Sequence, residues 1–178
     1  MSGAATVSDA SVAARPPLVE RLKQSADGIL EQIAREYGVS TFDVVSALPA
    51  EHRTIAPGSR FEEVLQTVAD WGEVLFIVHT PDIVLECTAR ISPGSFARGY
   101  FNLRGDSSIG GHIKAENCTH IAFVSRPFMG RPSRSVQFFN GAGEAMFKVF
   151  VRRDRERNLI GEQVERFDAL RHRLAGSG

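Results

Sequence analysis

The spacing of apolar residues changes twice along this chain, and the two changes divide it into three parts. Apolar residues recur every three or four positions from Leu18 to Trp71, every second position from Val74 to Val151, and every three or four positions again from Ile160. The first spacing places side chains on one helix face, and the second places them on one strand face. The chain is therefore predicted to be α+β, with N-terminal helices, an antiparallel β-sheet of about seven or more strands and a C-terminal helix.

The same pattern sets the expected domain organisation. Residues 1–17 lack periodicity and end in two prolines, so we interpret them as a flexible leader. Residues 18–178 are predicted to be one domain, because 178 residues suffice for a single core without disulfides. Its expected parts are a helical section, a sheet and a closing helix, at 18–71, 74–151 and 154–174.

Short local signals predict where individual elements begin and end. Gly38 stands at a helix C-terminus, and Ser40 and Ser59 each begin a capping signature with an acidic residue three positions later. The strand candidates are joined by spacers too short for helices, which favours an antiparallel meander. These candidates are residues 74–80, 83–89, 99–104, 112–115, 118–125, 135–140 and 145–151.

Composition excludes several classes of protein. Cys87 and Cys118 are too few for a disulfide framework or a four-thiolate zinc site, so we expect free thiols. No apolar run approaches the length of a membrane span, and the N-terminus has no export signal, so a cytoplasmic protein without membrane contact is predicted.

The charge balance of zero conceals an uneven distribution. Residues 1–70 carry six basic and ten acidic side chains, whereas residues 126–178 carry eleven basic and six acidic ones. This difference indicates either solvated helix surfaces or a basic face that attracts an anionic ligand. Residues 30–48 resemble a helix-turn-helix, but residues 41–48 contain no arginine or lysine to contact phosphates. Nucleic-acid binding is therefore disfavoured.

Histidines are the most informative polar residues of this sequence. Alternation places His79 on the strand face of Leu75 and Ile77, and His112 follows a glycine pair. Each could be a hydrogen-bonded structural residue or a ligand. No zinc motif accompanies them, whereas a haem site needs only one or two imidazoles and an apolar slot. Cys118 with His120, placed on one strand face, is a weak alternative as a nucleophile and base.

Several sequence blocks follow one another through the strand region. They include Val78-His79-Thr80, Gly99-Tyr100-Phe101-Asn102-Leu103-Arg104-Gly105, Gly111-His112-Ile113-Lys114-Ala115-Glu116-Asn117-Cys118 and Phe138-Phe139-Asn140. These blocks resemble the HutX/ChuX family of cytosolic haem-utilisation proteins. The similarity spans roughly residues 25–174 and is specific because the blocks are long and occur in family order.

The resemblance implies an intracellular carrier that binds haem (iron protoporphyrin IX) reversibly as cargo and passes it to haem-storing or haem-degrading proteins. It also implies a homodimer and a fold similar to one half of HemS/ChuS-type proteins. His79 and His112 match the family's haem-linked histidines and are the expected axial ligands of the iron. Arg104 and Lys114 flank the histidine loop, and we expect them to pair with the haem propionates.

Two other function classes remain as alternatives. The first is an enzyme that degrades or reduces haem or another tetrapyrrole, since related folds host such activity. The sequence contains no clear catalytic acid or redox motif, so a carrier without catalytic activity is preferred. The second alternative is a DNA-binding regulator. The sequence leaves open whether both histidines ligate one iron, whether one serves the other subunit, or whether one only orients a water molecule.

Overall fold

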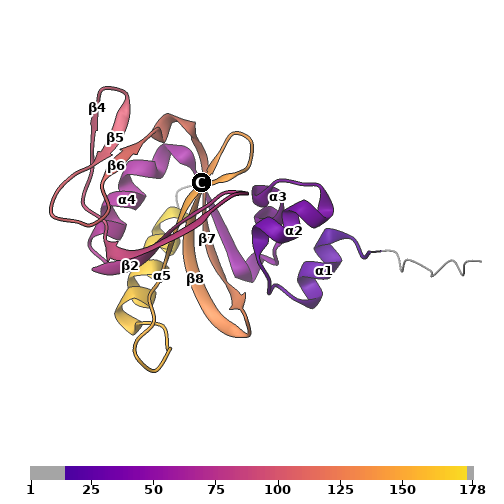
Figure 1. Ribbon diagram of the computed structural model, residues 1–178. Coiled ribbons are helices and arrows are strands. Elements are labelled where there is room, and N and C mark those ends of the chain that lie inside the picture. Colours follow the sequence, from indigo (N-terminus) through magenta and orange to yellow (C-terminus); the bar gives the residue numbers. More distant parts are fainter. Residues whose placement is uncertain (1–14, 176–178) are drawn as a thin grey trace, which may run out of the picture.

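A six-stranded antiparallel sheet forms the centre of the structure and carries helices on both faces (Figure 1). The computed structural model describes residues 15–175. The strand order in this large sheet is β1-β7-β8-β9-β2-β3, and every neighbouring pair is antiparallel. The predicted α+β class is therefore confirmed. The strands are β1 (Arg53–Pro57), β2 (Glu73–His79), β3 (Val84–Arg90), β7 (Cys118–Phe128), β8 (Arg131–Asn140) and β9 (Ala145–Phe150).

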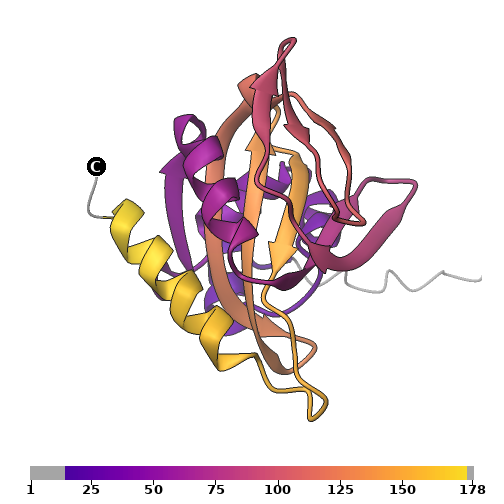
Figure 2. The ribbon, with the colours of Figure 1, turned by 90° about the vertical axis from the view of Figure 1, so that its left-hand side faces the viewer.

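Strand alternation assigns each face of the large sheet to a different group of helices. On β7, Ile121 and Phe123 belong to one core cluster, whereas Ala122 and Val124 belong to a second. The first cluster includes residues of α4 (Phe61–Ala69) and α5 (Gly161–Ala175), which cover that face of the sheet (Figure 2). The second includes residues of α1 (Leu18–Gln24), α2 (Leu30–Tyr37) and α3 (Thr41–Ala47).

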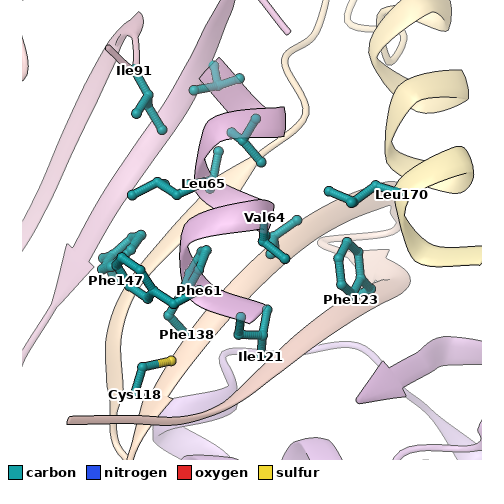
Figure 3. Packing of buried hydrophobic residues seen from close by; sticks show 14 of the residues in the cluster. Phe61, Val64, Leu65, Ile91, Cys118, Ile121, Phe123, Phe138, Phe147 and Leu170 are labelled. Carbon is teal, nitrogen blue, oxygen red and sulfur yellow. The ribbon is translucent and has the colours of Figure 1, made fainter. Parts of the chain in front are cut away.

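Helix α4 packs into the larger core along the face that its periodicity predicts. Its buried side chains, at positions 61, 64, 65 and 68, point toward the sheet, and Figure 3 shows Phe61 among the aromatic rings. The Phe61 ring makes edge contacts with the rings of Phe101, Phe138 and Phe147. These contacts fix α4 over β8 and β9, because aromatic pairs prefer such tilted geometries.

The N-terminal helices follow their predicted caps. Gly38 ends α2 in the left-handed conformation with φ +65°, and Ser40 and Asp43 form the reciprocal capping box of α3. Helix α3 buries Val44 and Val45 in the core cluster that it shares with the sheet. The helix pair that resembled a DNA-reading motif is thus packed against the sheet.

A second, three-stranded sheet lies on the α4 side of the molecule (Figure 2). It consists of β4 (Ser95–Ala97), β5 (Tyr100–Leu103) and β6 (Gly111–Ile113), in the order β4-β5-β6. Phe101 and Leu103 of β5 point into the main core and attach this small sheet to the rest of the protein. The face that carries Asn102 and His112 points the other way, because neighbouring strand residues alternate.

Four details differ from the sequence expectations. The strands form two sheets, and β9 pairs with β2 instead of continuing a simple meander. Two short strands, β1 and β4, were not expected. Ser59 does not cap α4, because it lies in the 3₁₀ turn at Gly58–Arg60 and Arg60 is the N-cap residue. Helix α5 begins at Gly161 instead of residue 154, because Asp154 accepts the amides of Glu156 and Asn158 in a turn.

The remaining elements are short or lie at the chain ends. Further 3₁₀ turns occupy Ala50–His52 and Ala115–Asn117. Most of the expected leader, residues 1–14, lies outside the described residues, and Pro16 and Pro17 are exposed. Among residues 15–175 there is no helix with the length and apolar character needed to cross a membrane.

Candidate functional site

An open groove runs over the part of the large sheet that α1–α3 leave uncovered. It has a volume of about 460 Å³, which lies within the range of small-molecule sites. We call it the His79 groove. Its floor comes from β2, β3, β8 and β9, and the first turn of α2 forms one wall. Its lining includes Ile29, Leu30, Glu31, Leu75, Ile77, His79, Val84, Glu86, Thr88, Arg126, Phe128, Ser133, Gln137, Lys148, Phe150, Val151, Arg152, Arg153 and Leu159.

His79 lies at the end of β2 on the groove floor, as strand alternation predicted. Leu75 and Ile77 share its face and line the same groove. The His79 Nδ1 atom lies 3.4 Å from Oε2 of Glu31, and the other oxygen of Glu31 is paired with the ammonium group of Lys148. The imidazole is therefore held from its Nδ1 side, which leaves Nε2 for another partner.

The charges of this cluster are balanced internally. Burial is the largest influence on the Glu31 carboxyl and raises its pKa, but the charge of Lys148 and its hydrogen bond outweigh burial, so the pKa is lowered overall. Burial lowers the pKa of Lys148, and Glu31 opposes this effect. Glu31 is thus ionised at neutral pH. At this place the apolar surface of the groove therefore carries the carboxylate of Glu31, the ammonium group of Lys148 and the imidazole of His79.

Arginines lie at the same groove and add positive charge. Arg126 donates to the carbonyls of Ala26 and Gly28, and burial lowers its pKa to about 10, which leaves it protonated at neutral pH. Arg152 is paired with Glu73. A flat apolar ligand with acidic substituents fits this chemistry, because the strand face can cover its ring while cations compensate its charge.

His112 lies outside the His79 groove, on the outer face of the small sheet. Its Nδ1 atom is 2.6 Å from Oδ1 of Asn102. The amide nitrogen of Asn102 donates to the carbonyls of Ser95, Ala97 and Tyr100, so Oδ1 must act as the acceptor. His112 therefore carries its proton on Nδ1, and its Nε2 lone pair is free.

Of the two predicted propionate partners, one lies near His112. The Lys114 ammonium group is 5.1 Å from the centre of the Tyr100 ring, and that ring also packs against His112. Arg104 is exposed directly after β5. The structure thus groups Lys114 with His112 through Tyr100. It does not bring either residue, or Arg104, into the groove of His79.

Sequence reasoning missed the ion pair of Glu31 and Lys148 beside His79. Glu31 and Lys148 are 117 positions apart, and only the fold brings them together. A weak signal existed, because Lys148 interrupts the apolar strand run from residue 145 to 151. Asn102 was also missed, since its role depends on pairing with His112 across β5 and β6.

The alternative site at Cys118 and His120 is wrong. A bulge between these residues shifts the strand register, so Cys118 points into the main core while the His120 ring stacks on Phe42. Burial raises the pKa of the Cys118 thiol to about 11, which opposes nucleophilic reactivity. Both cysteines are free, as expected. Within residues 15–175, no group of three or more His, Cys, Asp or Glu side chains could hold a metal ion.

Structures with distant sequences define the class of fold. Apo-PhuS, a heme-binding protein from Pseudomonas aeruginosa, matches with a TM-score of 0.71 at 14% identity. The match covers 85% of this chain but only 45% of PhuS, and the heme-degrading enzyme ChuS of Escherichia coli O157:H7 gives a similar result. This chain therefore has the fold of one half of these larger proteins, as predicted.

Closer relatives identify the family. The model of the family described as haem utilisation ChuX/HutX matches residues 54–170. The intracellular heme transport protein HutX of Vibrio cholerae is 40% identical over 161 residues, which are 85% of this chain and 83% of that protein. The chain belongs to the ChuX/HutX haem-utilisation family.

Solved structures agree with this assignment. A protein from Erwinia carotovora has a TM-score of 0.88 at 48% identity, covering 90% of this chain and 99% of that one. The heme-binding protein ChuX has a TM-score of 0.83 at 46% identity, covering 89% of this chain and 99% of its own.

Proposed function

We propose that this protein is an intracellular haem carrier that binds haem reversibly and transfers it to proteins that store or degrade it. Relatives that it resembles are described as a heme transport protein and a heme-binding protein. The observation that carries the proposal is the His79 groove, in which an imidazole stands on an otherwise largely apolar floor. No catalytic step is needed for this role.

The groove and the small sheet offer two different iron ligands. At either site, a neutral imidazole with its Nδ1 held by an oxygen is a suitable axial ligand for haem iron. We propose His79 as the principal ligand, because the apolar floor around it can cover the porphyrin. His112 is proposed as a second ligand that acts from the small sheet, on this chain or on a partner subunit.

Titration with haem tests the carrier. The Soret band should shift and saturate at one haem per chain, and His79→Ala should weaken the complex more than His112→Ala. His172→Ala is a matched control, because His172 is an exposed residue of α5 remote from both sites. A titration without saturation would overturn the proposal, and equal affinities of wild type and His79→Ala would overturn the ligand role of His79.

The enzymatic alternative predicts a different spectrum. We propose a carrier, so the Soret band of the loaded protein should persist when an electron donor is added in the presence of catalase. Steady loss of the band with release of iron would instead identify a haem-degrading enzyme.

The protein is also proposed to work as a homodimer, as the family resemblance implied. The chain corresponds to one half of PhuS, so two copies would supply the equivalent of both halves. Light scattering coupled to size exclusion should give twice the mass of one 19.5 kDa chain. A monomer at micromolar concentration, both with and without haem, would contradict this arrangement.

Transfer of haem is measured separately, by mixing the haem-loaded protein with candidate haem-degrading partners.

A further inference from the structure

Three ionisable side chains from three separate elements meet at one place in the His79 groove. Glu31 comes from α2, His79 from β2 and Lys148 from β9, and their side chains are 12%, 17% and 7% exposed. Burying such charges is costly, and well-packed apolar residues would stabilise the fold at least as well. A buried charged cluster at a ligand groove therefore indicates a functional requirement.

The two carboxylate oxygens of Glu31 face different partners. One carboxylate oxygen of Glu31 is paired with the Lys148 ammonium group, and the other faces Nδ1 of His79 at 3.4 Å. With each oxygen occupied, the carboxylate cannot turn freely. It favours a proton on Nδ1 of the imidazole and thereby leaves the Nε2 lone pair available.

We propose that Glu31 and Lys148 are positioning residues, which orient His79 so that its Nε2 lone pair faces haem iron in the groove. Glu31 holds the imidazole on its Nδ1 side, and Lys148 holds Glu31. This inference rests on the proposed function, with His79 as the ligand. A carboxylate behind a ligating histidine also makes the imidazole a stronger donor to the metal, and loss of such a partner commonly lowers metal affinity about 10- to 100-fold.

Single substitutions would leave a charge buried without its partner, so the informative variant removes both. Glu31→Leu with Lys148→Met replaces the pair with apolar side chains of similar volume, a change that buried pairs often tolerate. Glu165→Gln is the matched control, because Glu165 is an exposed residue of α5 that does not line the groove.

The first measurement uses the protein without haem. Nitrogen chemical shifts of the His79 ring, recorded by NMR at alkaline pH, should show mainly the Nδ1–H tautomer in wild type and in Glu165→Gln. The double variant should show a mixture of both tautomers. An unchanged tautomer in the double variant would overturn the proposal.

The second measurement is haem affinity. The double variant should bind haem about 10- to 100-fold more weakly than wild type, whereas Glu165→Gln should stay within about twofold. If His79→Ala loses affinity and the folded double variant does not, the positioning role is wrong and the carrier function stands. If His79→Ala binds as wild type does, His79 is not the ligand and this inference fails with that role.

Discussion

His79 and His112 differ in the oxygen atom that faces Nδ1 of the ring. A carboxylate faces Nδ1 of His79, whereas a neutral amide oxygen accepts from Nδ1 of His112. Asn102 can serve only as an acceptor toward His112, because its nitrogen is already engaged by three carbonyl groups. The side chain is 4% exposed, so these bonds are protected from water. The His112 ring is thus fixed before any ligand arrives.

Replacement of Asn102 with alanine should therefore release the His112 ring and destabilise the small sheet. The loss of the buried hydrogen-bonding partner should reduce the free energy of unfolding by about 1 to 3 kcal/mol. Urea unfolding measures this cost, and ring NMR should show a mixed His112 tautomer. Asn117→Ala, at an exposed position, is the control and should change neither result.

Glu31 should make stability depend on pH in the acidic range. Its pKa is lowered in the folded protein despite burial, because of Lys148, so the unfolded chain binds more protons as the pH falls. The stabilisation is present above the ordinary carboxyl pKa of 4.5 and is lost as the pH falls through the folded value. Urea unfolding between pH 7 and 3 should show a smaller decrease for Glu31→Leu with Lys148→Met than for wild type. Equal slopes would contradict this.

Single residues show where sequence reasoning succeeds. The face of His79 could be predicted, because alternation within one strand decides it. Glu31 could not, because its role depends on packing α2 against β2 and β9. Cys118 was placed on the wrong face, because a bulge between it and His120 inverts the side-chain order and leaves no clear mark in the sequence.

At the scale of elements, one clasp joins the N-terminal helices to the sheet. The Asp27 carboxylate accepts the amides of Met129 and Gly130 at the tip of the β7–β8 hairpin, and Arg126 donates back to the carbonyls beside Asp27. The bond from the Gly130 amide is the largest cause of the lowered pKa of Asp27. Because Arg126 also lines the His79 groove, this clasp helps to set the end of that groove.

Asp27→Ala should loosen the hairpin tip without unfolding the protein. The amides of Met129 and Gly130 lose their acceptor, so hydrogen exchange at residues 128–130 should accelerate while β8 and β9 remain protected. Asp82→Ala, in the exposed β2–β3 turn, is the matched control. Unchanged exchange at residues 128–130 would show that the clasp does not restrain the hairpin.

Gly58 permits a close approach between two elements. A methyl group at this position would overlap the backbone carbonyl of Cys118 at the start of β7. Gly58→Ala should therefore cost about 1 to 3 kcal/mol of unfolding free energy, because backbone cannot easily move away. Gly161→Ala, where a methyl group meets no atom within 4 Å, should be close to neutral in the same denaturation experiment.

Elements with a long periodic pattern could be predicted, and short ones could not. Helix α4 buries the face that its spacing indicated. Strands β1 and β4 are five and three residues long and lack clear alternation, so pairing with β7 and β5 decides their structure. The strand order of the large sheet could not be predicted either, because the pairing of β9 with β2 joins segments that are far apart in the sequence.

On the scale of the whole molecule, helices cover the two faces of the large sheet to different extents. One face is closed by α4 and α5 over the main core, and the other is only partly covered by α1–α3 (Figure 1). The uncovered part is the His79 groove. A sheet that leaves apolar strand surface open gains stability when a ligand or a second subunit covers it.

Haem should therefore stabilise the whole fold. A ligand that binds only the native state at 100 times its dissociation constant adds about 2.7 kcal/mol. For a domain of this size, that corresponds to a rise in Tm of roughly 5 to 10 °C. Thermal unfolding followed by far-UV circular dichroism should show the rise with wild type, and a smaller one with His79→Ala at the same haem concentration. Equal shifts for the two proteins would place haem outside the His79 groove, since covering that groove through His79 is the physical source of the stabilisation.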